Sequence, residues 1–121
     1  MEARLEVRPD HVHIVISGPF DLQAARNGIL RAAEACRKAA LDRVLVDGRS
    51  ITTIVPVMHR YELAKVLADE IAVRLRMAIV VSADNMSSKT LEETARNLGV
   101  EVRTTDSMAE AMIFLGLMVE R

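Results

Sequence analysis

Aromatic side chains are scarce in this chain of 121 residues, which has no Trp and only three aromatic residues, Phe20, Tyr61 and Phe114. Proteins that bind single-stranded nucleic acids stack bases on aromatic rings, so this scarcity removes their usual contact surface. Half of the residues are nonetheless hydrophobic. The core must therefore be built from aliphatic side chains, Ala and the seven Met residues.

Charge of one sign is not in excess either. The chain has 16 basic and 17 acidic residues and a formal net charge of −1, and both signs are scattered along it. No basic block is present that would neutralise a phosphate backbone, and no acidic tail is present. We therefore expect no nucleic-acid partner.

Cysteine pairs and long apolar runs are also missing. Cys36 is alone, which excludes an intramolecular disulfide and a metal-binding Cys pair, and its Ala neighbours at helical spacing predict a small buried side chain. No apolar run approaches the roughly 20 residues of a membrane helix. Residues 1–20 carry charges and a Pro, unlike a signal peptide. We expect one cytoplasmic domain covering residues 1–121.

The first half of the chain predicts a hairpin followed by a helix and a buried strand. Residues 5–7 and 11–16 are strand-like segments separated by a short turn, and such a short connection permits only antiparallel pairing. A helix is expected at about 22–40, with Asp21 as its N-cap. The apolar run in 43–47 predicts a strand buried on both faces.

An irregular loop is expected at residues 48–55, and a second helix from Pro56 to about Leu75. The residues expected to face the core are those that recur at helical spacing: Val57, Tyr61, Ala64, Ala68, Ile71 and Leu75. The residues expected in water are polar: His59, Glu62, Asp69 and Arg74. Leu63, Val66 and Leu67 widen the apolar face, which indicates either core or a dimer contact.

Two more strand–helix units complete the chain. A strand at 77–81 and a polar loop at 82–89 precede a capping box formed by Thr90 and Glu93. The helix behind this box is expected to bury three apolar residues and to end at Gly99. The buried residues expected in this helix are Leu91, Ala95 and Leu98.

The last unit begins with an alternating strand at 100–104. A second capping box, Ser107 with Glu110, starts the final helix, which Gly116 ends. The element order is β-β-α-β-α-β-α-β-α. It predicts an α/β fold with a mixed sheet of five strands, parallel in its later part.

Ligands usually bind beyond the carboxyl ends of the strands in such folds, where Asp47 is expected to emerge. The turn at 17–20 lacks the Gly-rich pattern of a nucleotide site, and there is no P-loop. His11 and His13 share one strand face, but no third metal ligand is near them in sequence. We expect no cofactor, no metal and, since no Ser-His-Asp order can be argued, no enzyme.

Asp47 at a strand end is similar to the phosphate-accepting residue of response-regulator receivers. A receiver also needs an acidic pair after its first strand and a Lys after its last. Residues 16–18 and 103–105 lie at those strand ends here and supply neither. We interpret Asp47 as a structural residue that caps backbone amides of the following loop.

The chain resembles the small bacterial SpoIIAA-like proteins of the STAS family, which are often grouped with lipid-binding Sec14 domains. The segments that carry this resemblance occur in the family's order: Val44–Arg49, Arg60–Ala64, Arg76–Val81, Ala95–Val100 and Glu110–Leu115. The resemblance implies a SpoIIAA-like (STAS) fold with helices packed mainly on one side of the sheet. Anti-sigma-factor antagonists in this family are switched by phosphorylation of a Ser at the start of the helix after the third strand.

That Ser would fall at positions 55–57 of this chain, which are Val55, Pro56 and Val57 and carry no hydroxyl. Thr52 and Thr53 precede the expected helix. The resemblance therefore implies the fold and a binding surface without the usual phospho-Ser switch.

Two hypotheses about function follow. The first is a non-enzymatic module that binds a protein partner or itself. Its candidate interaction surface consists of Asp47, Arg49, Ser50, Thr52, Thr53, Pro56, His59 and Arg60. The second is a Sec14-like protein that binds a small apolar, lipid-like ligand between helix and sheet. The residues that would line this pocket, unless they only fill the core, include Met58, Met77, Met108 and Met112.

Overall fold

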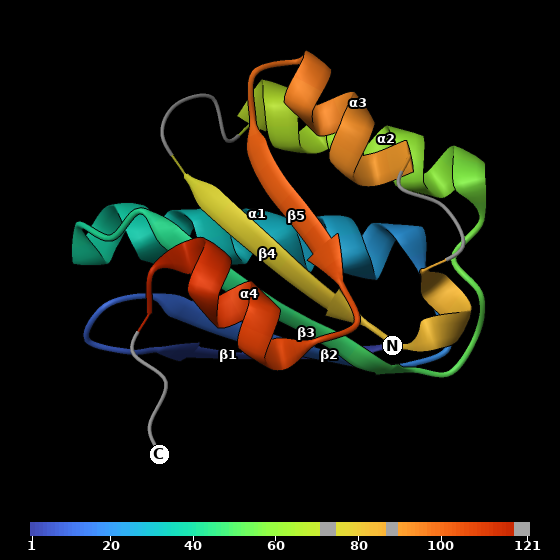
Figure 1. The fold of residues 1–121 in the computed structure, drawn as a ribbon, viewed down its shortest axis with the longest axis horizontal. Coiled ribbons are helices and arrows are strands. Elements are labelled where there is room, and N and C mark those ends of the chain that lie inside the picture. The colour runs from blue at the N-terminus through green and yellow to red at the C-terminus, as the bar shows by residue number, and fades with distance from the viewer. Residues whose placement is uncertain (71–74, 87–89, 118–121) are drawn as a thin grey trace.

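Five strands lie side by side in chain order in the computed structural model, which describes residues 1–70, 75–86 and 90–117 (Figure 1). The strands are β1 (Glu2–Val7), β2 (Val12–Gly18), β3 (Arg43–Ile51), β4 (Arg76–Val81) and β5 (Glu101–Thr105). β1 pairs with β2 in antiparallel fashion, and every later pair is parallel. The expected α/β class and mixed sheet are confirmed.

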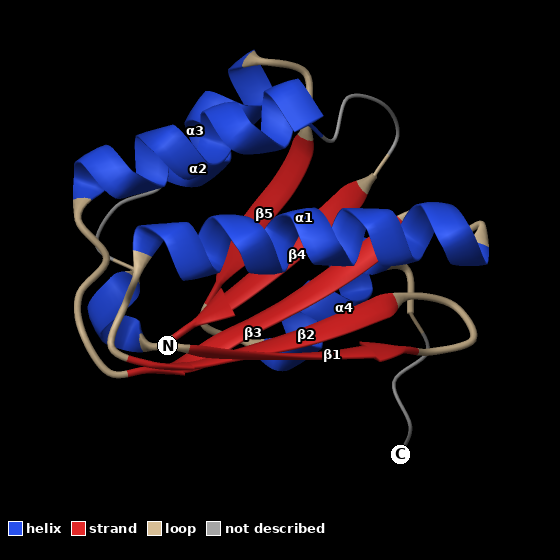
Figure 2. Cartoon of the chain, turned by 180° about the vertical axis from the view of Figure 1, so that it is seen from behind, coloured by secondary structure: helices blue, strands red, loops and turns tan. Residues whose placement is uncertain are grey.

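Helices cover both faces of this sheet, three on one face and one on the other (Figure 2). The helices are α1 (Leu22–Ala39), α2 (Val57–Glu70), α3 (Thr90–Asn97) and α4 (Met108–Leu115), with a 3₁₀ turn η1 (Ala83–Asn85) before α3. α1 packs on β1, β2 and β3, whereas α2 packs against α1 and α3. α4 packs alone on β3, β4 and β5.

Alternation along β3 divides the apolar side chains between two clusters. Val44 and Val46 are buried in the large cluster beneath α1, α2 and α3, while Leu45 between them belongs to a small cluster beneath α4. Successive side chains of a strand point to opposite faces. The two clusters are therefore separated by the sheet, and the β3 run is buried on both sides as its sequence predicts.

Several local features that the sequence predicts are present in the structure. The Asp21 side chain accepts a hydrogen bond from the Ala24 N–H at 3.0 Å and caps α1. Gly99 and Gly116 follow α3 and α4 with positive φ angles of 90° and 68°. A Cβ added at Gly28 would lie 3.2 Å from the Ile14 side chain, so this glycine lets α1 approach the sheet closely.

β3 is longer than the sequence indicates. It continues through residues 48–51, which we expected in a loop, so Asp47 lies within the strand rather than at its end. The register with β2 shifts here, because Val15 is opposite Asp47 but Ser17 is opposite Ser50. The extra β3 residue forms a β-bulge, which interrupts the alternation by which strands are recognised.

The face that α2 buries also differs from expectation. Val57 and Tyr61, predicted to face the core, are 54% and 44% exposed. The residues that α2 buries are Arg60, Leu63, Ala64 and Leu67. A buried arginine therefore replaces an apolar residue in the periodic pattern. α2 is described to Glu70 and Leu75 is not helical, while Ile71 and Arg74 lie outside the described residues.

Smaller corrections concern α3 and α4. Leu98, expected to be buried, is 51% exposed. The capping box expected at Thr90 depends on side chains outside the described residues. Ser107 caps α4 as predicted, by accepting a hydrogen bond from the Glu110 N–H at 3.2 Å. The Glu110 carboxylate accepts a hydrogen bond from the Thr105 hydroxyl instead of closing the capping box.

Candidate functional site

The loop of residues 52–56, which joins β3 to α2, is held by two buried polar side chains. The Val55 N–H donates to Asn85 Oδ1 at 2.8 Å, and Asn85 Nδ2 donates to the Thr53 carbonyl at 3.2 Å. Arg60 Nε donates to the Val55 carbonyl at 3.0 Å, and Arg60 Nη2 donates to Asn85 Oδ1 at 3.2 Å. These bonds fix the loop against the carboxyl edge of the sheet.

Sequence reasoning missed Asn85, which it placed in an undifferentiated polar loop. The residue belongs to η1 and is only 3% exposed. Its amide uses both its oxygen and its nitrogen on neighbouring chain segments, as a buried amide must. No periodic pattern in the sequence marks such a residue, because its partners are distant in the chain. The loop residues bonded to Asn85 lie 30 and 32 positions away, and Arg60 lies 25 positions away.

Arg60, assigned above to the interaction surface, is buried and 5% exposed, so that assignment is wrong. Loss of contact with water lowers the pKa of its guanidinium from the ordinary value. An arginine nevertheless stays protonated in proteins. Arg60 therefore places a positive charge inside the domain, next to the loop that it supports.

Asp47 and Arg49 form a separate unit on the face of the sheet that carries α4. Arg49 donates to Asp47 from Nε at 2.9 Å, from Nη2 at 2.8 Å and from its backbone N–H at 3.2 Å. The side-chain hydrogen bond from Arg49 is the main cause that lowers the pKa of Asp47 below its ordinary value. The amide-capping role of Asp47 is thus present, with Arg49 as its partner.

The remaining predicted surface residues differ in their surroundings. Thr52 and Pro56 are exposed, as is Thr53, but the Thr53 hydroxyl accepts a hydrogen bond from the Phe20 N–H at 2.9 Å. His59 is half-buried, and its ring lies 5.6 Å from that of Phe20. Ser50 is exposed next to the β3 bulge. Of the eight residues, Arg60 is buried and Asp47 and His59 are half-buried, so the predicted surface is not made of exposed side chains alone.

A row of exposed apolar side chains begins in the same loop and continues along α2. Ile54, in the loop, is 56% exposed, and Val57, Met58 and Tyr61 are 54%, 67% and 44% exposed. The last three residues stand at i, i+1 and i+4, which places them on one side of α2. We call these four residues the α2 stripe. Sequence reasoning missed it because it assigned Val57 and Tyr61 to the core.

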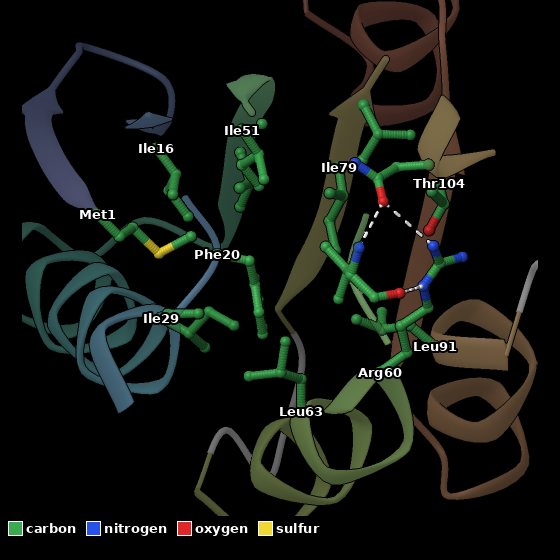
Figure 3. Close-up of a pocket in the computed structure, with 16 residues that line it drawn as sticks. Met1, Ile16, Phe20, Ile29, Ile51, Arg60, Leu63, Ile79, Leu91 and Thr104 are labelled. Carbon is green, nitrogen blue, oxygen red and sulfur yellow. Dashed lines mark hydrogen bonds between the residues drawn. The ribbon is translucent and has the colours of Figure 1, made fainter. Parts of the chain in front are cut away.

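An apolar pocket lies on the inner side of the loop, between the sheet and helices α1, α2 and α3 (Figure 3). Its volume is about 80 Å³. Polar residues at one end are Arg60, Asn85 and Thr104. None of the four Met residues proposed above lines it, although Met1 does. Met58 is exposed, Met77 is buried in the large cluster, and Met108 and Met112 belong to α4 and pack against the small cluster.

The pocket is smaller than sites for drug-sized ligands, which occupy about 300–1,000 Å³. Val55 of the 52–56 loop contributes to its wall together with Phe20 and Ile51, so the pocket and the loop share one residue. The 52–56 loop, held by Asn85 and Arg60, therefore has an apolar pocket on its inner side and the exposed apolar α2 stripe on its outer side.

Cys36 and the two hairpin histidines make local contacts. Burial raises the pKa of the Cys36 thiol to about 11, which leaves it protonated and unreactive at neutral pH. His11 Nδ1 lies 2.7 Å from the Asp10 carboxylate, and Arg8 Nη2 lies 3.3 Å from His13 Nδ1. In residues 1–70, 75–86 and 90–117, no group of three or more His, Cys, Asp or Glu side chains is arranged to hold a metal ion.

Within the described ranges, no helix has the length and apolar character required to cross a membrane. Comparison of the chain with profiles of known protein families finds no match, and comparison with curated protein sequences finds none either.

Proposed function

We propose that this protein is a non-enzymatic, STAS-like interaction module that binds a protein partner through the α2 stripe. The observation that carries the proposal is the exposure of three large apolar side chains on one side of α2, with a fourth, Ile54, in the loop just before this helix. Adjacent exposed apolar residues are typical of interaction sites, whereas isolated ones are not. Tyr and Met are also enriched in protein interfaces.

The loop that leads into the stripe supports this proposal. Ile54 lies between residues whose backbone groups are bonded to Asn85, and Arg60 anchors the first turn of α2 from inside. A surface that is ordered before binding loses less conformational entropy when a partner arrives. An apolar helix side of this kind fits a partner groove or a second helix.

The resemblance to STAS proteins supports the same class of function. The order of elements and the five-stranded mixed sheet agree with what the resemblance implies. Residues 55–57 have no hydroxyl, and Val55 is buried. We therefore propose partner binding that does not depend on a phospho-Ser at the start of α2.

The lipid-like ligand of the second hypothesis has less support. A cavity of about 80 Å³ is far below the volume that a drug-sized ligand requires, and a lipid is larger still. The interaction hypothesis therefore remains the one that the geometry favours.

The test starts with isolation of partners from an extract of the native cells, followed by affinity measurements on the purified pair. Replacing Tyr61 by Ala and Met58 by Lys should each weaken binding by about tenfold or more, because central aromatic and apolar contacts contribute most to such interfaces. Both side chains are exposed, so the free energy of unfolding should change by no more than about 0.5 kcal/mol.

Ile113, 72% exposed on α4, provides the control, since Ile113→Lys makes the same kind of change on the other face of the sheet. Its affinity should match that of the unmodified protein. Self-association is examined in parallel by sedimentation velocity. The proposal is wrong if binding survives both stripe substitutions or is lost only in Ile113→Lys.

A further inference from the structure

The pocket beneath the 52–56 loop is apolar almost throughout. α1 contributes Ala25 and Ile29, α2 contributes Leu63, and α3 contributes Leu91, while Phe20 lies at the start of α1 (Figure 3). Protein interiors are close-packed and leave few voids larger than one water molecule. This pocket, of about 80 Å³ and partly open to solvent, is larger than such voids.

Water fills such a space poorly. A buried water needs two to four polar partners, and a closed apolar cavity of about 150 Å³ remains dry, so water at the inner, apolar end of this pocket is weakly held. Atoms that line an empty space also lose dispersion contacts on one side. An apolar molecule that enters would restore these contacts without having to displace well-bound water.

Two of the three polar residues at the end of the pocket already have their side chains engaged by the protein. Arg60 donates to Val55 and Asn85, and Asn85 uses both ends of its amide. Thr104, whose backbone N–H donates to Glu92 Oε2 at 3.1 Å, adds only an uncharged hydroxyl. A charged ligand would have to break these bonds to be recognised. The chemistry of the wall therefore selects an uncharged molecule.

The volume of the pocket also limits which molecules can bind. A closed apolar cavity of about 150 Å³ holds benzene or xenon. The present pocket is about half as large but partly open to solvent, so one ring or a short branched chain would fill it and extend through its open side. A long acyl chain has no room.

We propose that this pocket is a binding site for a compact, uncharged apolar molecule of about the size of one six-membered ring. The site is independent of the α2 stripe, because Ile54, Val57, Met58 and Tyr61 do not line it. Failure of one proposal therefore leaves the other standing.

Titration with benzene, followed by NMR of ¹³C-labelled Ile, Leu and Val methyl groups, tests the site. Benzene should produce saturable shifts at methyls of Ile29, Ile51, Leu63 and Leu91 and leave Ile113 unchanged. At ten times its Kd it should raise the Tm by about 5 °C. Palmitate, added as the long charged competitor, should cause no saturable shift at the same methyls.

Ala25→Leu fills the pocket from α1 and should reduce the benzene-induced shifts at least tenfold. Ala35→Leu is the matched control, because Ala35 lies in the same helix but outside the pocket and should leave binding unchanged. If Ala25→Leu does not fold, Leu91→Phe fills the opposite wall. The proposal is overturned if benzene shifts no pocket methyl, if palmitate saturates the same methyls, or if a folded filling variant binds as before.

Discussion

The two faces of the sheet handle polar groups differently. Beneath α1, α2 and α3, Arg60 and Asn85 are buried and bonded to each other and to the 52–56 loop. On the α4 face, Asp47 and Arg49 form an ion pair in which the Arg49 side chain remains 51% exposed. The Arg60–Asn85 pair is enclosed under three helices, whereas the Asp47–Arg49 pair on the other face reaches solvent.

This difference implies different energetic roles. A hydrogen bond in a buried site is strong, and breaking it leaves a costly unsatisfied group. An ion pair in contact with water contributes little, because solvent and salt screen it. The three-helix face should therefore determine stability and the shape of the loop, whereas the α4 face should tolerate substitution.

Truncating one fully buried leucine on each face of the sheet should change the free energy of unfolding at least as much as any other substitution proposed below. Leu67→Ala, in α2, should lower the free energy of unfolding by about 4 kcal/mol, and Leu115→Ala, in α4, by about 2–3 kcal/mol. The smaller loss is expected because the thin α4 layer can move to close the cavity. Urea unfolding measures both values. A loss at Leu115 equal to or larger than that at Leu67 would contradict the comparison.

Removing the buried side-chain amide of Asn85 should have the next largest effect on stability. Asn85→Ala leaves the Val55 N–H without its acceptor and should cost about 2–3 kcal/mol. The neighbouring Asp84 is exposed in the same turn, and Asp84→Ala should change stability by less than about 0.5 kcal/mol. Hydrogen exchange at Val55 should accelerate in Asn85→Ala alone. Unchanged protection there would show that Asn85 does not hold the loop.

Much of the architecture follows from local patterns in the sequence. The hairpin, the alternation of strands and helices, the Asp21 cap and the glycine at the end of α4 each depend on nearby residues. Apolar periodicity reports burial when apolar residues are the ones buried. At α2 this condition fails, because Arg60 occupies a core position and Val57 and Tyr61 do not.

The candidate site could be predicted only in part for the same reason. Its approximate place, after β3 and at the start of α2, follows from the fold class. Its organisation depends on contacts between distant segments, such as Asn85 with Val55 and Phe20 with Thr53. The bulge that follows Asp47 in β3 depends on pairing with β2, which the sequence of β3 alone does not encode.

The smallest expected effect concerns Asp47, and it tests the α4 face directly. Asp47→Asn removes the charge that three Arg49 donors contact and should lower stability by about 1 kcal/mol at pH 7. Because the pKa of Asp47 is lower in the folded protein than the ordinary value near 3.8, its charge stabilises the fold above that pH. This contribution is lost as the pH falls through the lowered folded pKa.

A double-mutant cycle with Arg49→Gln separates the ion pair from other effects of either substitution. The coupling energy should be about 0.5–1 kcal/mol at pH 7, should shrink in 1 M salt and should vanish at low pH, where Asp47 is protonated in both states. An exposed pair cannot sustain a larger value against screening. A coupling of 3 kcal/mol that resists salt would mean that the α4 face encloses its charges as fully as the opposite face does, and the distinction between the two faces would fail.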